Sequence, residues 1–325
     1  MQVIQGIENL DRSPPGVILT IGNFDGVHRG HQEIIRLALE KARRNGGTCV
    51  VFTFRPHPQT ALKPGVHVQL LSTYDEKLEL LSQLGVDMVI EQPFSREFSS
   101  IECEDFFNDI ILHRLSAGSV IVGYDFSFGK ERRGHLACLE SLCKSTGVEL
   151  TIVPPQRRDG EVVSSSRIRQ HLLSGEIEEA NHLLGRPFSY RGIVIKGERR
   201  GHQLGFPTAN LKLDAKLTLP FGVYATIAIP QGIEPGPNPL IAQPREYFSV
   251  TNIGTRPTFQ AEGELTIPAL AETHLIGTTL DLYGNSLEVR FLKQLRHERR
   301  FSGMDELKRQ IGLDIEAAQK LFRSS

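Results

Sequence analysis

Two histidines lie three residues apart in a glycine-rich stretch near the beginning of the chain, GNFDGVHRGHQ (Gly22–Gln32). An apolar run, Val17–Ile21, precedes this stretch and predicts a strand. If a helix begins near Arg29, its first N–H groups and its dipole favour an anion. His28 and His31 then lie on nearly one face of the first turn, where two donors can stabilise charge that develops on a phosphate. The glycines let the backbone approach that phosphate closely, so the stretch predicts a site for a reacting phosphate.

Two other interpretations of this stretch remain open. The pair His28 and His31 could be half of a metal site, although no cysteine or carboxylate cluster nearby completes it. The glycines could serve only to make a turn, because the stretch is neither a GxGxxG fingerprint nor a GxxxxGK[ST] loop. The spacing of the histidines and their place behind a strand favour the phosphate hypothesis.

The first half of the chain alternates strand-like apolar runs with helical patterns. The expected strands are 17–21, 49–54, 86–90, 119–122 and 150–153, and the expected helices are 31–42, 73–84, 104–115, 135–143, 166–173 and 177–184. Thr73 and Glu76 form a capping-box signature at one helix start. The alternation predicts an α/β fold with a Rossmann-like, doubly wound parallel sheet and helices on both faces. Ligands bind such sheets at the carboxyl ends of strands near a switch in strand order, where the turn 22–30 is expected.

The second half, after residue 185, has a different pattern. Strand-like runs separated by turns are expected at 190–196, 223–229, 247–252, 270–276 and 287–292, followed by an amphipathic terminal helix at 304–322. This pattern predicts a β-barrel or a β-sandwich. Five prolines between Pro230 and Pro244 indicate a long surface loop. We therefore expect two domains, residues 1–185 and residues 186–325.

Composition and charge exclude several classes of protein. The 325 residues carry a formal net charge of −1, so no basic field indicates a nucleic acid or an anionic membrane as partner. No apolar run approaches the roughly 18 residues of a membrane span, and the N-terminal stretch lacks the regions of a signal peptide. The four cysteines form no CxxC motif, so we expect a reducing, cytoplasmic setting. Zinc bound through Cys138 and Cys143 is not expected, because no second pair follows them.

A set of motifs in order along the chain resembles a known family. His28 and His31 match the HxGH motif of the nucleotidyltransferase superfamily, and GNFDGVHRGHQ resembles the N-terminal module of prokaryotic bifunctional riboflavin kinase/FAD synthetases. The other matching stretches are TFRPHP (53–58), VGYDFSFGKERRG (122–134), VSSSRIR (163–169), GERRGHQLGFPTANL (197–211), GVYA (222–225), VTNIGTRPTF (250–259), ETHL (272–275) and DLYG (281–284). HxGH alone is weak, since several adenylyltransferases and class I tRNA synthetases carry relatives of it, but the ordered set covers nearly the whole chain. The resemblance implies an N-terminal FMN adenylyltransferase domain of the nucleotidyltransferase fold and a C-terminal β-barrel riboflavin kinase domain.

The resemblance implies that the first module makes FAD. The FMN phosphate would attack the α-phosphorus of ATP and pyrophosphate would leave, so the site must position two anions and stabilise their charge. His28 and His31 would contact the ATP phosphates, and Asn23 and Asp25 would orient phosphate or magnesium. The glycines implied at this nucleotide site are Gly22 and Gly30.

The stretch VSSSRIR is implied to belong to the same site. It supplies hydroxyl groups and cations at Ser164, Ser165, Ser166, Arg167 and Arg169. The family motif resembles ISSTxIR, so Arg169 is the motif arginine, implied to be catalytic, and Ser166 replaces a threonine but keeps its hydroxyl. In isolation the same string fits a serine N-cap with an exposed basic helix face.

The stretch DFSFG is implied to line the flavin or adenine pocket through Asp125, Phe126 and Phe128. For the two phenylalanines taken alone, a place in the hydrophobic core fits better.

The second module is implied to transfer the ATP γ-phosphate to the 5′-hydroxyl of riboflavin. A hydroxyl nucleophile needs a general base, and Glu272 of ETHL matches the catalytic glutamate of the family. His274 lies on the same side of the expected strand, because side chains alternate. Thr208 and Asn210 of PTAN match the magnesium-linked pair, and magnesium takes oxygen ligands and bridges phosphates. The resemblance implies that Gly197, Arg200, Gly201 and Gly205 form a flexible, basic loop that would cover the phosphates, and that Pro207 binds nucleotide or flavin.

The chain departs from the family pattern in two places. The family often has a second basic residue after the Arg-Gly pair, where this chain has His202. The proline-rich segment 230–244 is longer than usual and is interpreted as a surface insertion.

These observations together predict a cytoplasmic bifunctional enzyme that makes FMN and then FAD, with ATP and Mg²⁺ at both steps. Its substrates are ATP, riboflavin and FMN, and the resemblance also allows a homo-oligomer. Three alternatives stay open: an enzyme with one silent module, another adenylyltransferase, and a flavin-binding protein without catalysis. PTAN and ETHL in the second half have no place in an unrelated adenylyltransferase.

Overall fold

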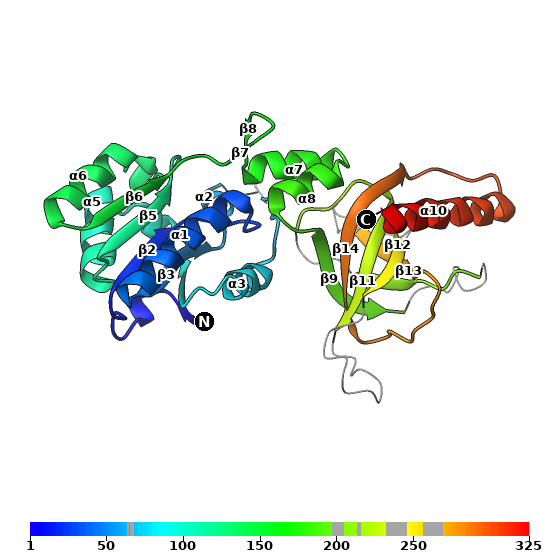
Figure 1. Ribbon diagram of the computed structural model, residues 1–325, viewed down its shortest axis with the longest axis horizontal. Coiled ribbons are helices and arrows are strands. Elements are labelled where there is room, and N and C mark those ends of the chain that lie inside the picture. The colour runs from blue at the N-terminus through cyan, green and yellow to red at the C-terminus, as the bar shows by residue number, and fades with distance from the viewer. Residues whose placement is uncertain are drawn as a thin grey trace. The chain divides into compact units, whose positions relative to one another are not determined.

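The structure is a computed structural model that describes residues 1–325 except 64, 66–67, 197–204, 213–215, 232–245, 256–268 and 325 (Figure 1). The chain divides into two compact units, Met1–Ser165 and Ser166–Ser325. The predicted boundary at residue 185 assigned helices α7 (Ser165–Leu173) and α8 (Ile177–Leu184) to the first domain. In the structure α8 belongs to the second unit, where the Asn181 side-chain amide of this helix donates to the carbonyl oxygen of Phe291 at 2.8 Å.

A six-stranded parallel sheet forms the centre of the first unit, in the order β1-β4-β3-β2-β5-β6. Its strands are β1 (Gln2–Gln5), β2 (Val17–Ile21), β3 (Thr48–Arg55), β4 (Met88–Pro93), β5 (Ser119–Gly123) and β6 (Glu149–Val153). From β2 the chain builds outward through β3 and β4, and then crosses to the other side of β2 to add β5 and β6. The predicted doubly wound sheet is confirmed, and its strand order reverses between β2 and β5. The edge strand β1 was not predicted.

Helices cover both faces of this sheet, as predicted. Ile18 and Val51 of the strands join a core with Ile35 of α1 (Arg29–Asn45), together with α3 (Tyr74–Gln83). Leu19 and Val50, one residue away on each strand, join a second core with η2 (Phe106–Arg114) and α6 (Leu136–Thr146). Both side-chain sets of each strand are therefore apolar, which is the pattern of a sheet buried on two sides.

Several short elements complete the first unit. They are η1 (Ile7–Asn9), α2 (Pro58–Leu62), α4 (Arg96–Ser99), α5 (Cys103–Asp105), η3 (Lys130–Arg132), β7 (Arg157–Arg158) and β8 (Glu161–Val162). The helix expected at 104–115 is found as α5 followed by η2, which has π-type hydrogen bonding.

The second unit contains a closed barrel in the order β10-β13-β12-β11-β14-β9, so the barrel alternative is confirmed over the sandwich. Its strands are β9 (Phe188–Ile195), β10 (Ala209–Lys212), β11 (Gly222–Gln231), β12 (Tyr247–Thr255), β13 (Ala269–Leu275) and β14 (Ser286–His297). The short strand β10 was not predicted. The proline-rich segment 230–244 lies almost entirely outside the described residues.

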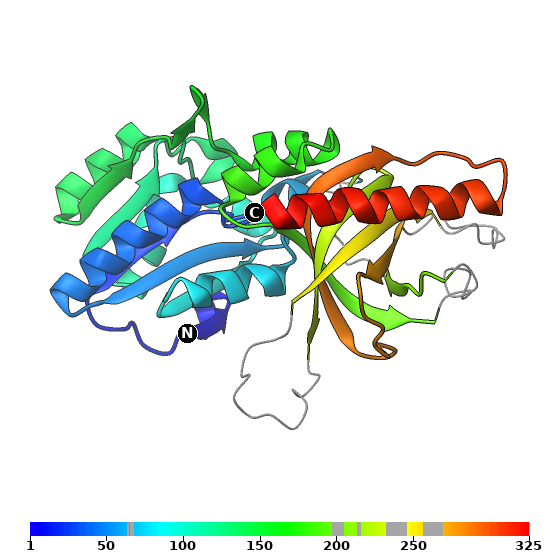
Figure 2. The ribbon, with the colours of Figure 1, turned by 45° about the vertical axis from the view of Figure 1, so that its right-hand side comes forward.

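Helix α10 (Met304–Ser324), in red in Figure 2, lies along the outside of the barrel, as the amphipathic pattern predicted. Ala318 of α10 is buried with Val223 and Val250 of the barrel strands. The Phe322 ring stacks on Phe248 at a centroid distance of 4.0 Å. These contacts cover an outer apolar patch of the barrel that would otherwise face water.

A chain of hydroxyl groups crosses the barrel interior on three neighbouring strands. Thr226 contacts both Ser249 and Thr251 at 2.8 Å, and Thr251 contacts Thr273 at 3.0 Å. All four side chains are fully buried. Buried hydroxyl groups are tolerated because each has a partner, so this chain fixes β13 against β12.

Replacement of Thr251 tests this arrangement, because its hydroxyl contacts two of the other buried hydroxyl groups. We expect Thr251→Val to lower the free energy of unfolding by about 1–3 kcal/mol, since two buried hydroxyl groups each lose a partner. Urea unfolding followed by circular dichroism measures the change. Thr279→Val, at an exposed position, is the matched control and should change stability by less than about 0.5 kcal/mol. Equal effects of the two substitutions would contradict the role of the hydroxyl chain.

Candidate active sites

The loop between β2 and α1 contains the two motif histidines. It leaves the carboxyl end of β2, where the strand order reverses, and α1 begins at Arg29 with His28 as its N-cap. The backbone N–H of His31 donates to Nδ1 of His28 at 3.4 Å. Because Nδ1 accepts this bond, a neutral His28 ring carries its proton on Nε2 and can donate it to a ligand. The first-turn N–H groups of α1 favour an anion at the same place.

The His28 and His31 rings are stacked, with their centroids 3.6 Å apart and their planes 19° from parallel. The Phe24 ring contacts His31 edge-on at 5.2 Å. Nδ1 of His31 is buried and has no hydrogen-bond partner within the described structure. Burial, and next the neighbouring His28 and Lys77, hold the pKa of His31 well below its ordinary value of 6.5. The geometry therefore presents His31 as a neutral ring next to His28.

Gly30, the glycine of HxGH, lies directly against the His28 ring. A Cβ at this position would approach Cε1 and Nδ1 of His28 to 3.2 Å, which is closer than ordinary packing. The glycine is needed for a steric reason, because a side chain would push the N-cap ring out of place.

The loop itself has a strained backbone. Phe24 and Val27 have positive φ angles of 50° and 40°, which cost energy for residues with a Cβ and most of all for a β-branched one. Three hydrogen bonds hold this conformation. The amide of Gly26 donates to Oγ of Ser72 at 3.2 Å, the Leu71 amide donates to Oδ1 of Asp25 at 2.9 Å, and Oγ of Ser165 donates to the Asp25 carbonyl at 3.1 Å. Strain held by its surroundings in this way is typical of ligand-binding loops.

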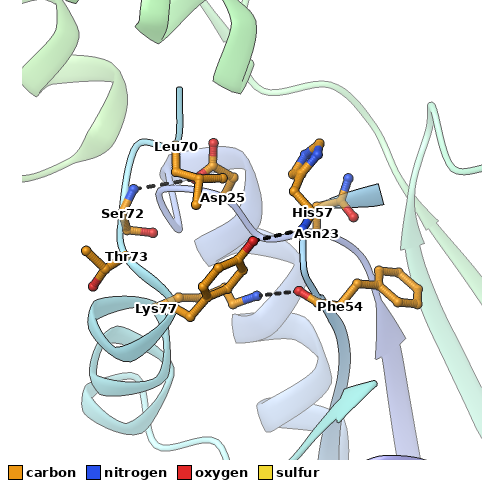
Figure 3. Close-up of a pocket in the computed structure, with 9 residues that line it drawn as sticks. Asn23, Asp25, Phe54, His57, Leu70, Ser72, Thr73 and Lys77 are labelled. Carbon is orange, nitrogen blue, oxygen red and sulfur yellow. Dashed lines mark hydrogen bonds between the residues drawn. The ribbon is translucent and has the colours of Figure 1, made fainter. Parts of the chain in front are cut away.

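A small pocket opens beside this loop (Figure 3). Its empty volume is about 220 Å³, part of it open solvent. The lining residues are Asn23, Asp25, Phe54, His57, Leu70, Ser72, Thr73, Tyr74 and Lys77. Asn23 and Asp25 were predicted for the nucleotide site, whereas the other lining residues were not.

Lys77 is a buried cation at the base of this pocket, only 3% exposed. Its Nζ donates to Oγ1 of Thr53 at 2.9 Å and to the Phe54 carbonyl at 3.3 Å. Thr53 in turn donates to the carbonyl of Asn23 at 3.2 Å. Burial lowers the pKa of Lys77 to about 8, against the opposing effects of Glu91 and Asp25. Lys77 therefore supports the histidine loop from below, through Thr53.

The sequence contains a signal for the burial of Lys77. Lys77 lies four residues before the buried Leu81, so it is on the core-facing side of α3. A lysine on that side is rarely buried without a specific partner. Thr53, Phe54 and His57 belong to the motif TFRPHP, for which no individual roles had been predicted.

The stretches SSSRIR and DFSFG differ in what the structure shows. Ser165 begins α7 and bonds to the Asp25 carbonyl, so it contacts the histidine loop directly. Arg167 lies further along α7 and donates to His171 at 3.3 Å. Asp125 is exposed and Phe126 is half-buried after β5, whereas Phe128 is 7% exposed and belongs to the core. For Phe128 the structure agrees with the core alternative.

The remaining predicted residues of these stretches are placed on or next to α7. Ser164 precedes the helix, and Ser166 and Arg169 lie within it. Their roles toward a nucleotide stay predictions.

A row of polar residues crosses three strands of the barrel. Asn210 of β10 and Asn252 of β12 both pair with Glu272 of β13 in the sheet register. Directly paired residues point to the same face, with Cβ atoms about 4.5–5.5 Å apart. Glu272 is exposed and Asn210 is buried, while the neighbouring Thr273 points into the barrel. The row therefore lies on the outer surface, and sequence reasoning missed Asn252.

His274 fixes the PTAN segment against β13. Its Nδ1 lies 2.9 Å from the carbonyl oxygen of Pro207, and its ring meets Phe206 edge-on at 5.6 Å. Thr208 follows Pro207 directly, so this contact places the Thr208 and Asn210 segment next to Glu272. Gly205 lies in an exposed turn with φ 85°, a conformation that favours glycine. Gly197, Arg200, Gly201 and His202 lie outside the described residues.

Each half of the chain matches a different family of known proteins. Residues 10–167 match the FAD synthetase family and residues 184–322 match the riboflavin kinase family. A protein of Escherichia coli (strain K12) named bifunctional riboflavin kinase/FMN adenylyltransferase is 35% identical, over 99% of this chain and 98% of its own length. Proteins with the same name from Haemophilus influenzae and Bacillus subtilis are 33% and 34% identical. The match to the Haemophilus influenzae protein covers 100% of both chains. The match to the Bacillus subtilis protein covers 94% of this chain and 92% of that protein.

A solved structure also matches the whole chain. It is a crystal structure from Streptococcus pneumoniae whose title describes a macrolide-efflux protein, and it is 30% identical with a TM-score of 0.84. The match covers 98% of this chain and 99% of that one. Among the described residues of this chain, no helix has the length and apolar character to cross a membrane.

The pH dependence of stability is expected to report on Lys77. Its pKa is about 8 in the folded chain against an ordinary value of 10.5, so between these pH values the unfolded chain binds the proton and the folded chain does not. Stability therefore rises with pH in this window. Relative to Lys77→Met, the wild-type chain should gain about 2–3 kcal/mol in free energy of unfolding from pH 8 to pH 10.

Urea unfolding at a series of pH values measures this difference. Lys63→Met, which replaces an exposed lysine, is the control. If wild type and Lys77→Met keep a constant difference from pH 8 to pH 10, Lys77 does not lose its proton in the folded chain at these pH values.

Proposed function

The chain belongs to the family of bifunctional riboflavin kinases/FMN adenylyltransferases, and we propose that it carries two active sites, one for each reaction, with the roles given below. The chain phosphorylates riboflavin to FMN and adenylylates FMN to FAD. The observation that carries the assignment of the first site is the capped N-terminus of α1, where two stacked histidines, a strained loop and a strand-order reversal coincide.

In the first unit, His28 and His31 bind the ATP phosphates during attack by the FMN phosphate on the α-phosphorus. The proton on Nε2 of His28 and the first-turn N–H groups of α1 stabilise the charge that develops there. Asn23 and Asp25 line the neighbouring pocket and orient the phosphates.

For FAD formation, Arg169 of α7 is the motif cation that the family sequence implies, and the hydroxyl groups of Ser164 and Ser166 belong to the same motif. Gly22, Ser165 and Arg167 belong to the nucleotide-binding residues as well. Asp125 and Phe126 line the pocket for the flavin or adenine ring.

In the second unit, Glu272 accepts the proton of the riboflavin 5′-hydroxyl while that oxygen attacks the γ-phosphate of ATP. The exposed carboxylate lies on a rigid strand, between Asn210 and Asn252 in the register. His274 positions the Pro207–Thr208 segment beside it. The motif with Gly197, Arg200, Gly201 and Gly205 is proposed to bind the ATP phosphates.

Mg²⁺ fits the donor set beside Glu272. The Thr208 hydroxyl and the Asn210 amide offer oxygen ligands, which this ion prefers over nitrogen or sulfur. When bound there, the ion would supply positive charge that offsets the charge of the ATP phosphates.

The chain is proposed to work in a reducing, cytoplasmic setting. All four cysteines are free, and free thiols of this kind are ordinary in such a compartment.

Replacement of the paired histidines tests the first site. We expect His28→Ala with His31→Ala to lower the rate of FAD formation from FMN by more than about 100-fold, since loss of one donor to a developing charge costs about 10²–10³. FMN formation from riboflavin should not change. Chromatographic separation of the flavins over time measures both rates, with His113→Ala, an exposed histidine of η2, as the control. Unchanged FAD formation in the double variant would refute the role of the histidines.

Replacement of Glu272 tests the second site. Glu272→Gln keeps the shape of the side chain but removes the base, so FMN formation should fall by about 10²–10⁴, while FAD formation from supplied FMN continues. Glu288→Gln on β14, where Glu288 pairs with Arg290 at 2.9 Å, is the matched barrel control. Loss of both activities in folded Glu272→Gln would contradict two separate sites.

A further inference from the structure

Three potential metal ligands converge in the first unit, away from the histidine loop. They are the thiols of Cys103 and Cys138 and the carboxylate of Glu104, whose ligand atoms all lie within 4.8 Å of one another. The two Sγ atoms are 3.5 Å apart, and the Cys103 thiol donates to Oε2 of Glu104 at 3.0 Å. Cys103 and Glu104 begin α5, whereas Cys138 lies in the first turn of α6, so two helices bring the ligands together.

The spacing of the two sulfur atoms fits shared coordination better than a covalent bond. Two thiolates at neighbouring corners of a tetrahedral zinc site, with Zn–S bonds of about 2.3 Å, are about 3.8 Å apart. A disulfide would require the sulfur atoms to approach to about 2.05 Å. The observed 3.5 Å needs an adjustment of only a few tenths of an ångström to accept a metal ion.

We propose that Cys103, Cys138 and Glu104 bind a divalent cation of the zinc class, with water at the fourth position. Thiolates select borderline-soft ions such as Zn²⁺ or Cd²⁺ over Mg²⁺. The burial of the three residues fits an ion that enters from one side: Cys103 is buried, Cys138 is half-buried and Glu104 is exposed. Binding releases two protons, one from each thiol, so that a dication meets two thiolates and one carboxylate.

The site lies under the segment 123–134. The amide of Lys130 donates to the Ile101 carbonyl at 2.8 Å, and a Cβ on Gly129 would come within 2.9 Å of the Cys103 backbone and side chain. This segment runs from the end of β5 to the start of α6, which carries Cys138. A bound ion would therefore link α5, which contacts this segment, to α6, which follows it in the sequence. This link would stabilise the first unit.

The test uses the full-length, tag-free chain, reduced and stripped of metal. Titration with Zn²⁺ in a calorimeter, and with Cd²⁺ followed by the thiolate-to-metal absorption band in the ultraviolet, should show one ion per chain. The thermal unfolding midpoint should rise with Zn²⁺ concentration. Cys138→Ser should weaken Zn²⁺ binding by more than about tenfold and abolish most of the Cd²⁺ band, since even outer-shell changes cost about 10–100-fold.

Cys143→Ser is the matched control, because Cys143 is a free thiol of the same helix outside the cluster. It should bind the ion like the wild type. Glu104→Gln, at an exposed position, should weaken binding without loss of the folded state, which covers the case in which a cysteine variant fails to fold. No Zn²⁺ binding by the wild type, or binding unchanged in Cys138→Ser and Glu104→Gln, would overturn the proposal. Formation of a Cys103–Cys138 disulfide without metal binding would overturn it as well.

Discussion

The hydrogen bond from the His31 amide to Nδ1 of His28 is the interaction on which the first site depends. It ends the loop after β2, begins α1 and fixes the orientation of a ring that can donate to a phosphate. Gly30 leaves room for that ring, and the positive φ of Val27 turns the chain toward it. One local contact thus marks the start of the helix and orients the His28 ring.

The two candidate sites have different kinds of structural support. The first uses the end of a strand in a sheet that is buried on both faces, with Lys77 holding the loop from below through Thr53. The second uses a row of side chains on the outer surface of a closed barrel, fixed from inside by the Thr251 and Thr273 hydroxyl contact. In both units, a rigid backbone decides where the polar groups stand.

Much of the fold could be predicted, because long apolar runs and capping patterns are local signals. The capping box of Thr73 and Glu76 is present as both of its hydrogen bonds. The strands β1 and β10 were missed because each is only four residues long, too short to establish a period. The alternation of strands and helices along the chain could not show the order of the strands in the sheet. That order depends on which strands pair with each other.

Local spacing was enough to predict two features that the structure contains: a histidine N-cap followed two residues later by glycine, and a glutamate and a histidine on one face of a single strand. Only the tertiary structure decided which distant residues meet these groups. Lys77 contacts Thr53 beneath the loop that follows β2, and Asn252 lies beside Glu272. The Cys138 thiol lies 3.5 Å from the thiol of Cys103, which is 35 residues away in the sequence. The physical reason is that spacing along a chain fixes contacts within one turn or strand, whereas packing and strand register fix contacts between elements.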